Sequence, residues 1–196
     1  MKKIVLASNN ANKIKEIGKL LEPFGVEIKG LKELGLGDPV EDGKNFMENS
    51  LIKAKYAYEK TGLPSLADDS GFCVDSMNGF PGLSSARFIK AVGGEQNAFN
   101  VVNECINPHN KKAYFITSMV FIYEDKDGKT VIKDFEGKID GNFVFPARGN
   151  GGFGFDPVFM PNGYDKTFAE MPEEKLKISH RTIALNKFIE FFKTLK

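Results

Sequence analysis

Two aspartates, Asp68 and Asp69, stand side by side in a stretch from Thr61 to Ala86 that contains no lysine or arginine. Carboxylates without a basic partner nearby in the chain serve either solvent or a cation. Adjacent side chains of an extended segment point to opposite faces, so we expect only one of the two to face a given site. A turn is the plainer interpretation of Asp-Asp-Ser-Gly. Because apolar residues flank the motif, we expect it at the end of buried strands, where open α/β sheets bind ligands.

A second acidic group, Glu41-Asp42-Gly43, lies in the loop before a predicted helix. If Glu41 meets Asp69 in space, two hard oxygen ligands become available for Mg²⁺, which prefers a few carboxylates together with water and substrate phosphate. Asp68 is the alternative second ligand, and the sequence does not choose between it and Glu41. A solvated acidic turn is the competing interpretation of the whole group.

Such a metal would need phosphate contacts, and a polar loop near the N-terminus is the candidate for them. The loop separates a predicted strand over 3–7 from a predicted helix that ends before Pro23. Backbone N–H groups and the helix N-terminus could face an anion there, although an ordinary capped loop fits equally well. The candidate residues are Ser8, Asn9, Asn10, Ala11, Asn12 and Lys13.

A glycine-rich segment, residues 148–156, matches a dinucleotide fingerprint but is not followed by a helix start, which argues against a Rossmann site. We expect its glycines to let the backbone approach a ligand, with Phe153 or Phe155 as a stacking plane. Placement of these rings in the core is the alternative. Further along, His180-Arg181 follows two lysines at the start of the last helix and offers several donors, unless this is a solvated basic face.

The elements that must position these residues alternate between strand and helix patterns, which indicates a single mixed α/β unit with two lobes and a cleft. The segment that holds the paired aspartates reads as two short strands or one bent strand. We expect strands over 3–7 and 26–29, helices from about 45 and over 95–106, a hairpin joining 114–123 to 130–135, and a closing helix from Pro172.

The composition excludes several classes of protein. The chain has 196 residues, of which 41% are hydrophobic and 27% charged, so it is neither disordered nor of low complexity. A net charge of +1 argues against a partner such as nucleic acid or an anionic membrane. Cys73 and Cys105 suggest buried free thiols. No apolar run has the length of a signal or membrane segment, so we expect a soluble cytoplasmic protein.

Taken together, these segments resemble the non-canonical purine nucleoside triphosphate pyrophosphatases, also called inosine/xanthosine triphosphate pyrophosphatases. Each piece is weak alone, but six in order over nearly the whole chain are specific. The pieces are the segment 7–13, Glu41-Asp42-Gly43 with Phe46, Glu48-Asn49-Ser50 and Lys53-Ala54, the segment 67–71, Gly79-Phe80-Pro81-Gly82 with Ser85-Ala86-Arg87, the segment 151–157, and Ser179-His180-Arg181.

The resemblance implies an elongated mixed sheet flanked by helices, with an active-site cleft between two lobes, over residues 1–196 as one domain. It implies Mg²⁺-dependent hydrolysis of ITP, dITP or XTP to the monophosphate and pyrophosphate, usually by a homodimer. Asp69 would be the catalytic acid position and, with Glu41, a metal ligand. The resemblance places Ser70 beside the substrate. The other implied substrate contacts are the loop Ser8 to Lys13 and Lys53 at the phosphates, and Phe153, Gly154, Phe155, Asp156, Lys175, His180 and Arg181 around the base and sugar.

Two positions depart from the family pattern. Val40 stands where many members have an acid, so Glu41 alone must serve as the second metal ligand, and Phe155 stands where tyrosine is common. The nearest rival is the septum-related nucleotide pyrophosphatase group, whose N-terminal loop has a different sequence. A non-catalytic nucleotide sensor or nucleic-acid binder is the rival from another class, and the acidic groups and near-neutral charge argue against it.

Overall fold

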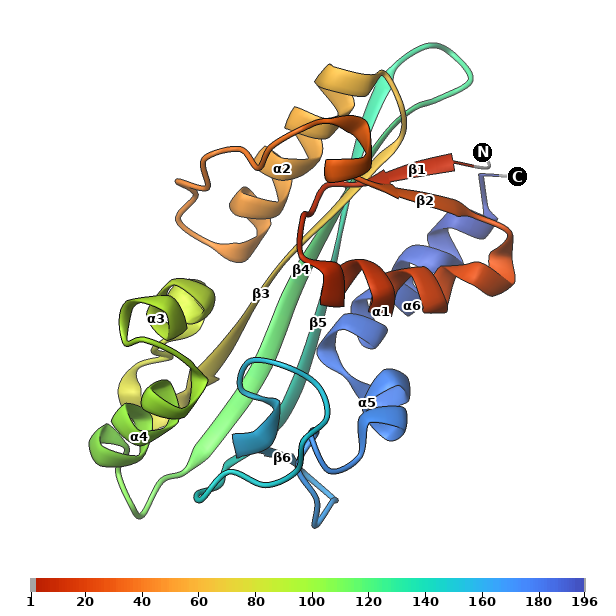
Figure 1. The fold of residues 1–196 in the computed structure, drawn as a ribbon. Helices are drawn as coiled ribbons and strands as arrows, with labels where there is room; N and C mark the ends of the chain where they lie inside the picture. The colour runs from red at the N-terminus through yellow and green to blue at the C-terminus, as the bar shows by residue number, and fades with distance from the viewer. Residues whose placement is uncertain (1–2, 196) are drawn as a thin grey trace. The chain divides into compact units, whose positions relative to one another are not determined.

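The computed structural model describes residues 3–195, which form one six-stranded mixed sheet with helices beside it (Figure 1). The strand order is β2-β1-β3-β4-β5-β6, with β1 parallel to both β2 and β3 and with β6 antiparallel to β5. The strands are β1 (Lys3–Leu6), β2 (Glu27–Gly30), β3 (Ser65–Val74), β4 (Lys112–Glu124), β5 (Thr130–Phe143) and β6 (Phe159–Pro161). The expected mixed α/β class is confirmed.

Side-chain caps explain where the first two long helices begin. Asn10 caps α1 by accepting from the N–H groups of Asn12 and Lys13, and Asn45 caps α2 by accepting from that of Glu48. A left-handed Gly62 ends α2, as glycine does at many helix C-termini. The helices are α1 (Ala11–Leu21), α2 (Phe46–Thr61), α3 (Ser85–Ala91), α4 (Glu95–Cys105), α5 (Pro172–Ile178) and α6 (His180–Lys193).

The described chain divides into two compact units. Unit 1 comprises residues 3–69, 117–137 and 182–195, and unit 2 comprises residues 70–116 and 138–181. Strands β3, β4 and β5 contribute residues to both units. The boundary in β3 falls between Asp69 and Ser70, so the candidate residues divide between the two units.

Unit 1 has a core on each face of its part of the sheet, and strand alternation assigns the residues to them. Ile4 and Leu6 of β1 pack with α1 and α6 in one core, whereas Val5 and Ala7 pack with α2 in the other. Figure 1 shows α2 on one side of these strands and α1 with α6 on the other. In β3, Leu66 belongs to the α1 and α6 face, so every second residue after it has the same direction.

Unit 2 is built around phenylalanines. Phe72 of β3 stacks on Phe155 with ring centroids 4.6 Å apart, and Phe115 of β4 meets Phe159 edge to face at 4.9 Å. All of these rings are buried. Aromatic pairs at such spacings stabilise a core beyond the area that they bury.

The structure corrects several expectations of local structure. The stretch around Asp68 and Asp69 lies within one continuous strand rather than at a strand end, because residues on both sides of it pair in the sheet. The closing helix is two helices, since Ser179 has an extended backbone between α5 and α6. Cys105 is exposed, and only Cys73 of the two free thiols is buried. Helix α3 and strand β6 were missed because both are short.

Candidate functional site

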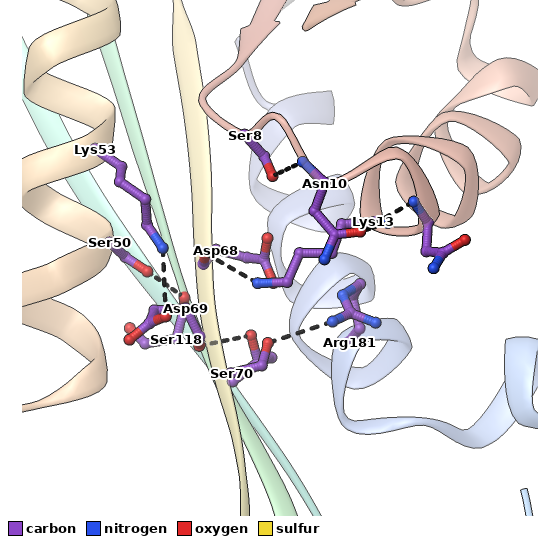
Figure 2. A network of polar contacts seen from close by, with 12 residues as sticks. Ser8, Asn10, Lys13, Ser50, Lys53, Asp68, Asp69, Ser70, Ser118 and Arg181 are labelled. Carbon is purple, nitrogen blue, oxygen red and sulfur yellow. Dashed lines mark hydrogen bonds and ion pairs between the residues drawn. The ribbon is translucent and has the colours of Figure 1, made fainter. Parts of the chain in front are cut away.

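Asp68 and Asp69 point to opposite faces of β3, as alternation along a strand requires (Figure 2). Asp68 points to the α1 face, where its Oδ2 lies 3.0 Å from Lys13 Nζ. Asp69 points to the α2 face, where its Oδ1 lies 3.3 Å from Lys53 Nζ. Both carboxylates therefore have a lysine partner from a distant part of the sequence, which the absence of nearby basic residues did not predict.

Asp69 is held by two residues of α2. Lys53 approaches Oδ1, and Asn49 Nδ2 donates to Oδ2 at 3.2 Å. Asn49 and Lys53 are four residues apart, so they lie one turn apart on the same face of the helix. The ammonium of Lys53 also lies 3.2 Å from Glu41 Oε1. Glu41 and Asp69 therefore meet at one positive charge, whereas Asp68 points to the other face of the strand.

Burial and neighbouring charges shift the pKa values of Asp69 and Lys53 in opposite directions. Burial raises the pKa of the Asp69 carboxyl, and the charges of Lys53 and Lys13 reduce that rise without cancelling it. For Lys53, burial lowers the pKa of the ammonium, but Asp69, Asp68 and Glu41 outweigh burial and raise it. Lys53 thus stays charged, and Asp69 binds a proton more readily than an exposed aspartate.

The predicted anion loop of unit 1 forms the junction of β1 and α1. Ser8 Oγ accepts from the Asn10 N–H at 3.1 Å, and Asn10 Oδ1 accepts from the N–H groups of Asn12 and Lys13 at 3.0 and 3.3 Å. These bonds occupy three of the N–H groups that we expected to face a phosphate. Ala11 is exposed, and Asn9 is half-buried.

In unit 2, the glycine-rich loop holds Phe153 half-buried against two cations. Lys175 Nζ lies 4.7 Å and Arg181 Cζ 5.9 Å from the centroid of its ring. The loop is fixed by Asp156, whose Oδ2 accepts from the Phe153 N–H at 2.9 Å and forms a buried ion pair with Lys175 Nζ at 2.7 Å. This cluster presents an aromatic ring with neighbouring donors.

His180 and Arg181 begin α6, and both are almost completely buried, so a solvated basic face is the wrong interpretation for these two residues, although Lys177 before them is exposed. The His180 ring lies flat on Phe115, with an interplanar angle of 9° and centroids 4.8 Å apart. Its edge, rather than its face, is therefore the part that can form hydrogen bonds. Arg181 Nη2 donates to Ser70 Oγ at 3.4 Å.

One expectation about the glycine-rich loop is corrected. Phe155 is a core residue, 2% exposed and stacked on Phe72, so of the two candidate rings only Phe153 is exposed enough to meet a ligand. Some glycines of the loop also have an intramolecular reason, because a Cβ at Gly149 would lie 2.5 Å from the backbone of residue 169. A Cβ at Gly152, where φ is +74°, would collide with the Asp156 carboxylate.

Sequence reasoning assigned no role to two residues that brace these groups. Asn49 holds Asp69 as described, and Glu95 Oε1 accepts from the Gly154 N–H at 2.7 Å. An asparagine inside a predicted helix was the available signal for Asn49, since asparagine is a poor helix former. Within residues 3–195, no group of three or more His, Cys, Asp or Glu side chains is arranged to hold a metal ion.

Comparison with known proteins identifies the family. The model of the Ham1 family matches residues 4–191, so the chain belongs to that family. A dITP/XTP pyrophosphatase of Zymomonas mobilis is 40% identical over 95% of this chain and 90% of its own. A dITP/XTP pyrophosphatase of Haemophilus influenzae is 42% identical over 94% of this chain and 95% of its own. The structure of the Staphylococcus aureus Ham1 protein has a TM-score of 0.84 at 33% identity and covers both chains completely.

Proposed function

We propose that this chain hydrolyses the non-canonical purine nucleoside triphosphates dITP, ITP and XTP to the monophosphate and pyrophosphate, with Mg²⁺ as cofactor. The observation that carries the proposal is the meeting of Asp69 and Glu41 at the Lys53 ammonium, in a chain whose relatives of nearly full length are dITP/XTP pyrophosphatases. Septum-type pyrophosphatases and non-catalytic sensors have no comparable support.

The donor set fits a hard divalent cation. Two carboxylates from different elements already face one positive charge, and Mg²⁺ takes one or two carboxylates and fills its other positions with water and phosphate oxygens. Asp69 and Glu41 would hold the metal, and the direction of Asp68, which points to Lys13 on the other face of β3, favours Glu41 over it as the second ligand. When bound, Mg²⁺ would neutralise charge that develops on the phosphate oxygens.

The chain's own residues would perform the remaining steps. Asp69 orients a water molecule and accepts its proton as the oxygen attacks the α-phosphorus, and pyrophosphate leaves. Lys53 keeps Asp69 and Glu41 together despite their like charges. Lys13, although paired with Asp68, adds positive charge beside the loop Ser8 to Lys13, which would contact the phosphates.

Base selection would depend on unit 2. Phe153 offers the stacking plane, and donors of His180 and Arg181 would meet the 6-oxo group of hypoxanthine or xanthine. Adenine has an amino donor at that position and would leave buried protein donors without an acceptor, which such sites reject strongly. Ser70, Gly154, Asp156 and Lys175 would support this contact.

The assembly and location of the protein are part of the proposal. We expect a cytoplasmic homodimer that acts on free nucleotides and binds neither nucleic acid nor membrane. The net charge of +1 supports a small ligand rather than a polyanion. No helix within residues 3–195 is long and apolar enough to cross a membrane. Sedimentation analysis of the purified chain tests the dimer.

A product analysis tests the proposed reaction. The protein is incubated with ITP, dITP, XTP, ATP or GTP and Mg²⁺ in ¹⁸O-labelled water. We expect pyrophosphate from the 6-oxo non-canonical substrates, with the label in the monophosphate because water attacks the α-phosphorus. Asp69→Asn should abolish turnover, whereas Asp75→Asn, an exposed carboxylate of the same segment, should not. Release of orthophosphate, or equal rates with ATP and GTP, would contradict the proposal.

A further inference from the structure

Besides Lys53, a second side chain of α2, Asn49, joins the loop that carries Glu41 to the strand that carries Asp69. Asn49 Oδ1 accepts from the backbone N–H of Gly43 at 2.8 Å, and Asn49 Nδ2 donates to Asp69 Oδ2 at 3.2 Å. Gly43 lies two residues after Glu41. The amide thus uses its acceptor on the loop and its donor on the carboxylate.

This arrangement leaves no freedom for the amide to reverse. If the oxygen and nitrogen of Asn49 exchanged places, an acceptor would face the Asp69 carboxylate and a donor would face the Gly43 N–H. Asn49 is 1% exposed, so water cannot replace either bond. Its orientation is therefore fixed by both partners.

The packing around Gly43 confirms that the loop lies close against this side chain. A Cβ at Gly43 would lie 2.6 Å from Asn49 Oδ1 and 2.8 Å from the Asn49 backbone nitrogen. Any side chain at position 43 must therefore push the loop away from α2. Glu41 would move with it, since only one residue separates the two.

Resting on the proposed function, we propose that Asn49 is a positioning residue that sets the spacing between Glu41 and Asp69 for the divalent metal. Lys53 supplies the charge that lets the two carboxylates approach, but an ammonium on a flexible stem fixes no angle. Asn49 fixes the Asp69 carboxylate by donating to its Oδ2, and it fixes the loop by accepting from the backbone N–H of Gly43. Groups that orient metal ligands in this way contribute about 10- to 100-fold to metal affinity or activity.

The test compares Asn49→Leu and Asn49→Ala with wild type in the full chain. Mn²⁺ affinity is measured by electron paramagnetic resonance without nucleotide, together with kcat, KM and thermal stability. Ser50→Ala is the matched control, because Ser50 is also fully buried on α2 but donates to the Ser118 carbonyl at 2.7 Å (Figure 2). Gly43→Ala perturbs the same contact from the loop.

We expect the two Asn49 variants to bind Mn²⁺ about 10- to 100-fold more weakly and to lose kcat by a similar factor. Gly43→Ala should likewise lower both Mn²⁺ affinity and kcat. Ser50→Ala should lose stability while retaining Mn²⁺ affinity and kcat. If the Asn49 variants lost only stability, as Ser50→Ala does, Asn49 would be merely structural and the inference would be wrong. A wild-type chain that neither bound Mn²⁺ nor released pyrophosphate would instead overturn the proposed function, and this inference with it.

Discussion

Replacing Lys53 by methionine tests the electrostatics of the candidate site most directly. Methionine keeps most of the length and apolar volume of the side chain but removes the charge that Asp69 and Glu41 share at 3.3 and 3.2 Å. The Lys53 side chain is 7% exposed and that of Asp69 12%, so solvent screens the pair little. Removing one partner of such a buried pair costs about 3–5 kcal/mol, because the remaining charge is left in a poorly solvating site.

For a chain of this size, each kcal/mol lowers the melting temperature by about 2–4 °C, so Lys53→Met should melt about 6–20 °C below wild type without metal. Added Mg²⁺ should stabilise the variant more than the wild type, because a divalent cation restores a counter-charge to the two carboxylates. Differential scanning calorimetry with and without Mg²⁺ measures both effects.

Lys193→Met is the control for this prediction, since Lys193 forms an exposed pair with Glu190 and its loss should cost no more than about 0.5 kcal/mol. The reasoning is refuted if Lys53→Met melts within about 2 °C of wild type without metal. It is also refuted if Mg²⁺ stabilises both proteins equally.

Three further predictions concern unit 2. Phe155→Ala should cost about 3–5 kcal/mol of stability, because it empties a core position. Phe153→Ala should instead raise KM with little loss of stability. Equal stability losses of the two variants in denaturant titrations would contradict this division. His180→Ala should lower ITP turnover more than ATP turnover, and equal losses in steady-state rates would exclude base reading. Burial raises the pKa of the Cys73 thiol to about 11, so its contribution to stability is complete below pH 9 and is lost towards pH 11. Iodoacetamide at pH 8 should therefore label only Cys105, as mass spectrometry would show, and labelling of both native thiols would contradict it.

Long periodic segments were predictable because the hydrophobic pattern and the caps are local. The helix that begins after Asn45 and the end of α1 before Pro23 lie where they were expected. Helix α1, however, begins at Ala11, inside the expected loop 8–13, and β5 extends to Phe143, beyond the expected end of that strand at 135. For the segment through Asp68 and Asp69, two short strands or one bent strand both remained open, because its four polar residues resemble a turn, and only pairing with neighbouring strands shows one continuous strand. The helix break at Ser179 has no glycine or proline to indicate it.

Residue type and spacing by themselves indicated the paired aspartates, the acidic group at Glu41, the polar loop 8–13, the glycine-rich loop and His180-Arg181 as candidates. Lys53 became a candidate only through the resemblance to a known family. The sequence also implied that Asp68 and Asp69 face opposite ways. Only the tertiary structure decided their partners, because Lys13 and Lys53 come from helices far away in the sequence. It likewise chose Glu41 over Asp68 beside Asp69, placed Phe155 in the core, and made Asn49 the link between loop and strand. These outcomes depend on which helix packs on which face of the sheet, and that is a property of the folded chain rather than of any local segment.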